Sequence, residues 1–214
     1  MKVVRSLVVS MFAVLAPFAV VAESPEAVPA PDGPVPVMAV WIEQEIYFPY
    51  NSVTSYYSCE GLKSKVSSIL KAIGARSGFK VTARGCFNRR SGAELTPSLE
   101  IVAAMPRAAT PEVLSQLAKD ESRRELAAKA SGKAPGTSDT TAEFPARARR
   151  IDFRDSQLGL LQPGDCDLVE QMIDKVFVPL GAKIVAQDMN CFPRTLNRGI
   201  IALSIDVLEP VPQQ

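Results

Sequence analysis

Two stretches of the chain match position by position: "SCEGLKSKVSSILKAIGA" (residues 58–75) and "DCDLVEQMIDKVFVPLGA" (residues 165–182). When Cys59 is aligned with Cys166, the same apolar spacing recurs, as Val66, Ile69, Leu70 and Ile73 in the first stretch and as Ile173, Val176, Phe177 and Leu180 in the second. This spacing places one apolar stripe on a helix face. Each stretch begins with a cap residue and an early acid and ends in Gly-Ala. The alignment predicts two equivalent helices, and Pro179 predicts that regular helix ends early in the second.

Alternating apolar residues lie on both sides of each predicted helix and indicate strands. Ahead of the first helix, residues 40–48 alternate between apolar and mostly polar side chains; ahead of the second, "RRIDFRD" (residues 149–155) is a shorter candidate. After each helix come two further strand-like runs, which are "FKVTARGCF" and "LEIVAAMP" in the first copy and "KIVAQDMNCF" and "IIALSIDVLEP" in the second. Each copy therefore has the order strand, helix, strand, strand.

These patterns predict an α+β fold made by internal duplication of a β-α-β-β unit. We expect antiparallel pairing, with the helices packed on one face, one disulfide in each repeat and a connecting helix between the repeats. The patterns leave open whether the six strands join into one sheet or form two small sheets. The order of elements resembles that of the small α/β sandwich modules of bacterial envelope proteins.

The regions outside the repeats divide the chain further. Residues 1–22 combine two early basic residues with an apolar run and predict a secretory signal peptide; a membrane anchor is the alternative, but the run is short and Pro17 interrupts it. Residues 23–38 contain five prolines and predict a Pro-rich linker. The repeats are then assigned to residues 39–107 and 144–214, and residues 108–143 to a connecting helix and a flexible linker. Thr110 and Pro111 predict the start of that helix, which we expect to end near Ala130 and to lie loosely on the surface.

Export changes the interpretation of the four cysteines, because exported chains form disulfides. A helix of about 16 residues is about 24 Å long, and a following strand of about eight residues returns about 27 Å. A strand that runs antiparallel beneath its own helix therefore ends beside the start of that helix. This geometry predicts the disulfides Cys59–Cys86 and Cys166–Cys191, in a periplasmic or secreted protein.

The composition excludes several chemistries. The chain has no histidine, which excludes Ser-His-Asp triads and His-based zinc sites. The formal charge of +1 gives no strong field for nucleic acid. Ser68 and Lys71 have the Ser-x-x-Lys spacing of acyl-serine enzymes, but they lie inside an amphipathic helix without the accompanying motifs. We expect no metal site, no cofactor and no membrane span after signal cleavage.

Arginines and aromatic residues are the candidate binding groups. Arginine suits bidentate capture of carboxylate or phosphate, and the candidates are Arg149 and Arg150 in a basic stretch, with Arg89 and Arg194 three residues after a cysteine. Tyr47 and Tyr57 belong to an aromatic cluster that suits either a ligand groove or core packing. The acids around the second helix are interpreted as helix caps and solvated loop residues, since a calcium site or an acid–base pair would need them to converge (Asp152, Asp155, Asp165, Asp167).

The sequence thus favours an exported, non-enzymatic binding module of the bacterial envelope, which contacts a protein or envelope partner through an exposed sheet face or edge. Two alternatives are a carrier of a small ligand or lipid with an aromatic-lined pocket, and a carboxylate-based hydrolase or transferase with a cleft between the repeats.

Overall fold

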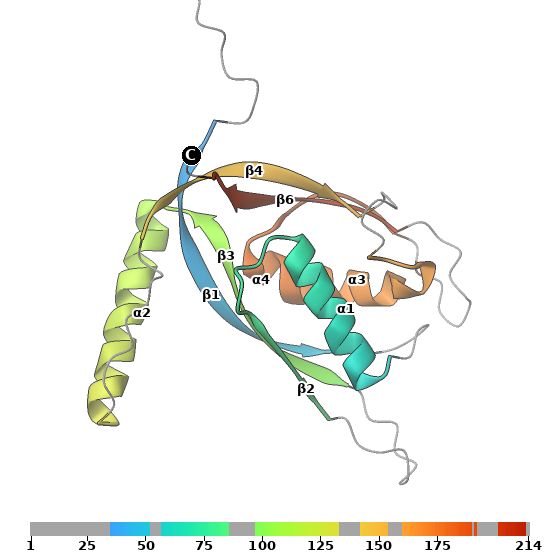
Figure 1. Ribbon diagram of the computed structural model, residues 1–214, viewed down its shortest axis with the longest axis horizontal. Helices are drawn as coiled ribbons and strands as arrows, with labels where there is room; N and C mark the ends of the chain where they lie inside the picture. The colour runs from blue at the N-terminus through green and yellow to red at the C-terminus, as the bar shows by residue number, and fades with distance from the viewer. Residues whose placement is uncertain are drawn as a thin grey trace, which may run out of the picture. The chain divides into compact units, whose positions relative to one another are not determined.

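Six strands form one antiparallel sheet in the computed structural model (Figure 1), in the order β2-β3-β1-β4-β6-β5. The structure describes residues 35–51, 57–85, 97–132, 142–153, 160–189, 191 and 201–212. The strands are β1 (Val37–Pro49), β2 (Lys80–Arg84), β3 (Ser98–Ala108), β4 (Phe144–Asp152), β5 (Lys183–Asp188) and β6 (Ala202–Pro210). The α+β prediction is confirmed, and the open question about the sheet is settled in favour of one sheet.

A short contact between β1 and β4 joins the two halves of the sheet. The first half contains β1, β2 and β3, and the second contains β4, β5 and β6. The only registered pairs between these strands are Val37 with Ala146, Met38 with Pro145, and Ala39 with Phe144. In contrast, β1 pairs with β3 from Ala39 to Pro49. Beyond Ala39, β1 and β4 are therefore no longer neighbours in the sheet.

Helix α1 (Cys59–Ala72) follows the predicted amphipathic pattern. The Ser58 hydroxyl accepts a hydrogen bond from the backbone N–H of Gly61 at 3.1 Å, which caps the helix. The residues of its apolar stripe are buried (Leu62, Val66, Ile69, Leu70). Gly74, just past its end, has φ of +87°, the left-handed conformation that glycine adopts readily.

In the second helical segment the regular α-helix ends at Met172, ahead of Pro179 as predicted, but the chain stays helical as far as Leu180. The segment consists of α3 (Cys166–Met172), a π-helical turn (Ile173–Phe177) and α4 (Val178–Leu180), after a short 3₁₀ turn (Pro163–Asp165). A proline ring clashes with the carbonyl one turn earlier and supplies no N–H. The wider π turn immediately ahead of Pro179 relieves this conflict, so the chain stays helical up to Leu180.

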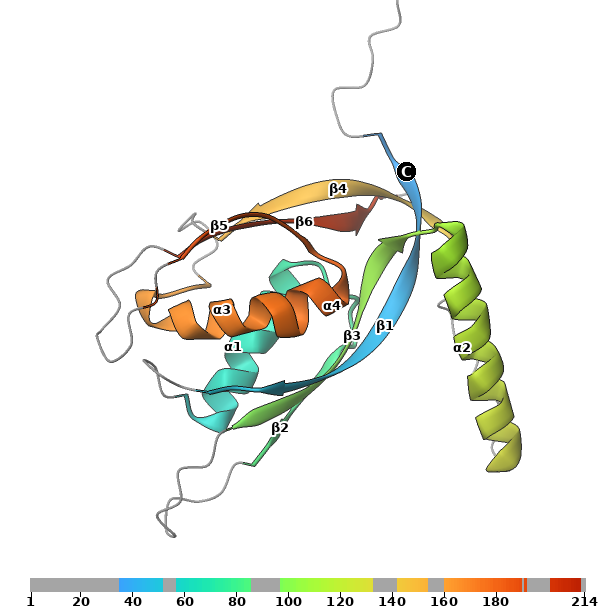
Figure 2. The same ribbon diagram turned by 180° about the vertical axis from the view of Figure 1, so that it is seen from behind.

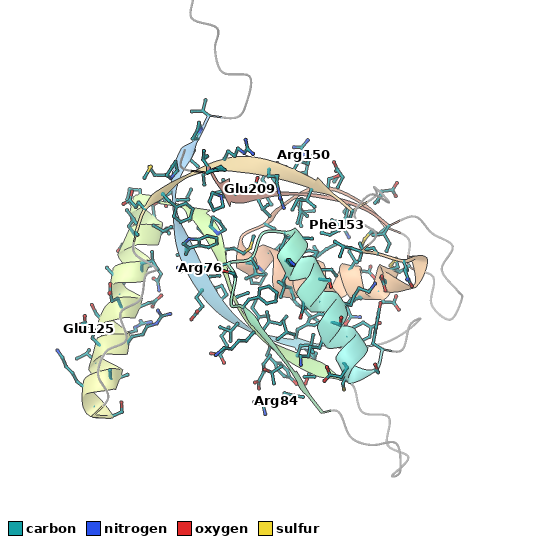
Figure 3. All side chains as sticks on the ribbon, viewed as in Figure 1. Arg76, Arg84, Glu125, Arg150, Phe153 and Glu209 are labelled. Carbon is teal, nitrogen blue, oxygen red and sulfur yellow. A yellow bond between two sulfur atoms is a disulfide. The ribbon has the colours of Figure 1, made fainter. Side chains whose placement is uncertain are left out.

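The core lies between one face of the sheet and these helices. Figures 1 and 2 show α1 and α3 on the same side of a curved sheet. One continuous hydrophobic cluster contains residues from both helical segments and from the strands of both halves. At the end of β4, Phe153 points into this core (Figure 3) and stacks on Phe177 with ring centroids 5.8 Å apart. The prediction that these helices cover one face is therefore confirmed.

The connecting helix, α2 (Pro111–Ala130), has the predicted bounds. The Thr110 hydroxyl accepts a hydrogen bond from the Val113 N–H at 3.4 Å, and no residue of the helix is buried. Both views show α2 beside β1, on the side away from β3. It therefore does not join α1 and α3 over the core.

Two boundaries differ from the sequence prediction. Strand β4 begins at Phe144 and ends at Asp152, whereas the predicted run covered residues 149–155. Its first residues lack apolar alternation in the sequence, and they form a strand by pairing with both β1 and β6. Strand β1 begins at Val37, inside the predicted linker. No helix among the described residues is long and apolar enough to cross a membrane.

Candidate functional site

One disulfide lies wholly within the described residues. Cys166, at the start of α3, is bonded to Cys191, with their Cα atoms 5.6 Å apart, so this predicted pair is confirmed. Cys59, at the start of α1, is also disulfide-bonded. Its predicted partner, Cys86, lies outside the described residues.

Arg149 was a predicted binding residue, but its side chain contacts the fold itself. Its Nη2 atom donates a hydrogen bond of 2.6 Å to the carbonyl oxygen of Ala72, the last residue of α1. Its Nη1 atom lies 3.0 Å from a carboxylate oxygen of Glu209 on β6, a residue labelled in Figure 3. A cation at a helix C-terminus satisfies a free carbonyl and interacts favourably with the helix dipole. Arg149 therefore joins β4 of the second half to α1 of the first.

Arg107, which the sequence analysis did not single out, makes the reverse connection. It lies on β3 of the first half, and its Nη2 atom donates a hydrogen bond to the carbonyl oxygen of Pro179 in α4. In the alignment of Cys59 with Cys166, Pro179 corresponds to Ala72. Among the described residues, the buried side-chain polar atoms without a hydrogen-bond partner are the Nε atoms of Arg107 and Arg149. The sequence does contain one signal that could have identified Arg107, because it is a cationic residue near the end of an apolar strand.

Gly181 shows how closely Arg107 packs against the end of α4. Its φ is +93°, and a Cβ atom there would lie 2.8 Å from Cδ and from Cζ of Arg107 and closer still to Nε. Any side chain at this position would displace the guanidinium group. Glycine at this position therefore suits the left-handed backbone conformation and leaves the Arg107 side chain in place.

Tyr57 and Lys65 hold the start of the second helical segment against the first. The Tyr57 hydroxyl donates to one carboxylate oxygen of Asp165, and Lys65 Nζ lies 2.9 Å from the other. That second oxygen also accepts from the Gln162 N–H at 2.7 Å. Burial and the hydrogen bond to Asp165 raise the pKa of the Tyr57 phenol well above its ordinary value. The cluster supplies neither a free base nor a free acid, and its position gives it a structural role.

The other predicted binding residues lie apart from one another. Arg150 forms an ion pair with Asp206 across β4 and β6 at 2.9 Å, which lowers the pKa of the Asp206 carboxyl. The Tyr47 side chain is 64% exposed on β1. Arg89 and Arg194 lie outside the described residues. The structure therefore does not gather the described candidates into one site.

The acids near the second helix are also dispersed. Asp152 accepts a hydrogen bond from Ser204, and Asp155 lies outside the described residues. Oxygen atoms of Asp167 and Glu170 lie within 4.8 Å of Cys191 Sγ. Because that sulfur is bonded to Cys166, it cannot act as a thiolate ligand.

The aromatic residues mainly fill the core. Phe48, Tyr50 and Phe177 are fully buried, and Tyr50 packs edge-on against Tyr57 with centroids 5.6 Å apart. Trp41 instead packs outside the main core cluster, 5.2 Å from Phe144 between centroids and under the guanidinium of Arg76 at 5.5 Å (Figure 3). These contacts describe packing and give no ligand groove.

A groove does lie between β1 and α2. It encloses a cavity of about 190 Å³. Its walls are a three-residue stretch of β1, Arg107 and one stripe of α2 (Ile42, Glu43, Gln44, Arg107, Val113, Gln116, Leu117, Asp120, Glu121, Arg124). The β1 wall lies beyond Ala39, where β4 no longer pairs with this strand. The groove therefore combines a strand edge with charged side chains, a combination suited to binding a peptide.

Comparisons with protein-family models, curated proteins and solved structures found no match to this chain.

Proposed function

We propose that the protein is an exported, non-enzymatic interaction module of the bacterial envelope, which binds a partner protein through the uncovered side of its sheet. The observation that carries this proposal is the one-sided cover of the sheet. Ile46 and Phe48 of β1 are buried beneath the helices, whereas Glu45 and Tyr47, which alternate with them, are exposed. A face that no helix covers is available for a partner.

The polar groups of the candidate site interact with other groups of the fold, and this supports binding rather than catalysis. The carboxylate of Asp165 accepts from Tyr57, Lys65 and the backbone. Arg149 binds a helix end and Glu209. An acid–base mechanism needs groups that converge on a substrate, and the groups described here converge on each other. Among the described residues, the buried apolar side chains form one continuous cluster, which favours this proposal over the lipid-carrier alternative, because a carrier requires an apolar cavity.

Site-specific photo-cross-linking tests this function. A photoreactive amino acid is placed at Tyr47 on the open face or, as the control, at Ser68 on the exposed side of α1, in cells that make the protein. We expect a discrete protein adduct from position 47 and none from position 68. Equal adducts from both positions, or none from position 47, would contradict the proposal.

We also propose that the chain arose by internal duplication, enters the periplasm through the signal peptide of residues 1–22 and is active there or after secretion. Three features support the duplication. The order β-α-β-β occurs on each side of α2, the strand order reads equivalently from both edges of the sheet, and arginines from opposite halves bind the carbonyls of Ala72 and Pro179. N-terminal sequencing of the mature protein from the envelope tests export, and a mature chain that still begins at Met1 would contradict it.

A further inference from the structure

Two prolines in the neighbouring strands show which backbone groups of β1 point toward its free edge. Pro106 pairs with Trp41 and Pro145 pairs with Met38, and neither proline has an N–H to donate. These are therefore the non-hydrogen-bonded pairs of their ladders. The Met38 carbonyl accepts instead from the Ala109 N–H, on the β3 side, at 2.9 Å.

Because hydrogen-bonding direction alternates along an antiparallel strand, Val40, Ile42 and Gln44 direct their backbone groups toward β3. Trp41, Glu43 and Glu45 direct theirs away from it. Among the described residues, no strand pairs with this second edge beyond Ala39. It is a template for an added strand.

Helix α2 forms the opposite wall of this edge. The stripe from Val113 to Arg124 is about 16 Å long at 1.5 Å per residue, which matches about five residues of extended chain. The apolar residues Val113 and Leu117 on this stripe are half-buried. The groove therefore has the length of a short strand.

The charges of the groove select a basic occupant. Glu43 and Glu121 line it, and neither has an ion-pair partner in the described part of the chain. The lining holds three acids (Glu43, Asp120, Glu121) against two arginines (Arg107, Arg124), so its formal charge is −1. Glu45 adds another exposed carboxylate on the same strand. The charge of this region is therefore negative, which favours lysine or arginine in the partner.

The other edges are less suitable. The register of β5 against β6 shifts between Ile184 and Ala186, and such a bulge hinders further pairing. Strand β2 is only five residues long and carries Lys80 and Arg84, charges that protect an edge. The part of β4 beyond Ala146 is mainly basic, with Arg147, Arg149 and Arg150 against one acid, Asp152.

We propose that the groove between β1 and α2 binds an extended, lysine- or arginine-bearing segment of a partner protein, which adds as a strand to β1. This rests on the proposed function and specifies its binding surface. The backbone edge supplies affinity, and the acidic walls select the sequence. The single tryptophan, Trp41, lies on the edge itself and reports binding through its fluorescence.

The test is a fluorescence titration with a blocked peptide of alternating lysine and valine, about seven residues long, which spans the groove with about one residue to spare at each end. Its controls are the glutamate–valine counterpart and the lysine peptide with alternate backbone nitrogens methylated. The double variant Glu43→Lys with Glu121→Lys reverses the charge of the groove. The matched variant Glu60→Lys with Glu125→Lys makes the same charge change outside the groove lining (Figure 3 labels Glu125).

We expect the lysine peptide to bind the natural protein and the matched variant alike, and the groove variant on the order of tenfold more weakly. The glutamate and methylated peptides should not bind. Three results of the titration would overturn the proposal: equal binding to both variants, equal binding of the methylated peptide, or no binding of the lysine peptide. A dimer detected by ultracentrifugation, in which a second copy of the chain occupies the edge, would also overturn it. If the adduct from position 47 survives in the groove variant, the interaction function stands and this groove is the wrong surface.

Discussion

Arg149 Nη2 lies 2.6 Å from the carbonyl oxygen of Ala72, so a strand of the second half caps the helix of the first. Arg107 makes the reverse connection to Pro179. Together with the shared hydrophobic core, these contacts make the stability of each half depend on the other. We expect the two halves to unfold in one cooperative transition.

Replacement of Arg149 tests this link. Arg149→Met removes the hydrogen bond to α1 and the ion pair with Glu209, and we expect the free energy of unfolding to fall by about 1–2 kcal/mol. Arg150→Met is the matched control on the same strand, because its pair with Asp206 is more exposed; its loss of stability should be clearly smaller. Urea denaturation measures both values, and equal losses would contradict the capping role.

Gly74 and Gly181 occupy equivalent positions in the two halves. Their substitution separates the stability cost of backbone strain from the cost of crowding. Gly74→Ala places a Cβ in open space at φ of +87°, and we expect it to cost about 1 kcal/mol. Gly181→Ala has the same strain and also collides with Arg107, so we expect a loss of at least about 2 kcal/mol. Thermal and urea denaturation compare them. Identical losses would show that Arg107 does not pack against Gly181 as described.

The raised pKa of Tyr57 predicts a pH dependence. The folded state holds the phenolic proton more tightly than the unfolded state, in which tyrosine ionises near pH 10. The unfolded state therefore binds fewer protons above that pH, and stability falls as pH rises. Tyr57→Phe should lose stability less steeply between about pH 9.5 and pH 11. Stability measured across this range in both proteins provides the check, and parallel curves would argue against the buried phenol.

Peptide mapping under non-reducing conditions tests the disulfides. We expect fragments that join Cys166 to Cys191 and Cys59 to Cys86; a fragment that joins Cys59 to Cys166 would contradict the arrangement by halves.

Replacing both Cys166 and Cys191 with alanine should lower the unfolding free energy by about 3 kcal/mol, as expected for the 25-residue separation that the bond closes.

Local signals in the sequence were sufficient for α1, for α2 and for one disulfide. Ser58 and Thr110 cap the helices where the pattern predicted, and helix and strand lengths brought Cys166 to Cys191. The π turn was not predictable, because the effect of Pro179 depends on how the preceding turn adapts. The start of β4 was also missed, because its first residues lack apolar alternation and their strand pairing with β1 and β6 is long-range.

The candidate site was the harder part to predict. Arg149 and Tyr57 were identified as functional residues because charged and aromatic side chains often bind ligands, but their partners are an α1 carbonyl and Asp165. The β1 groove depends on where two strands diverge, which is a consequence of sheet curvature and long-range register. Neither quantity is encoded in the local pattern around Glu43.

Amide hydrogen exchange along β1, resolved by NMR, tests the central claim that this strand has one paired and one free edge. We predict slow exchange at Val40, Ile42 and Gln44, whose N–H groups face β3, and fast exchange at Trp41, Glu43 and Glu45. The lysine–valine peptide should then slow exchange at the second set alone. Slow exchange at all six positions without peptide would show that the edge is already covered and would contradict the account.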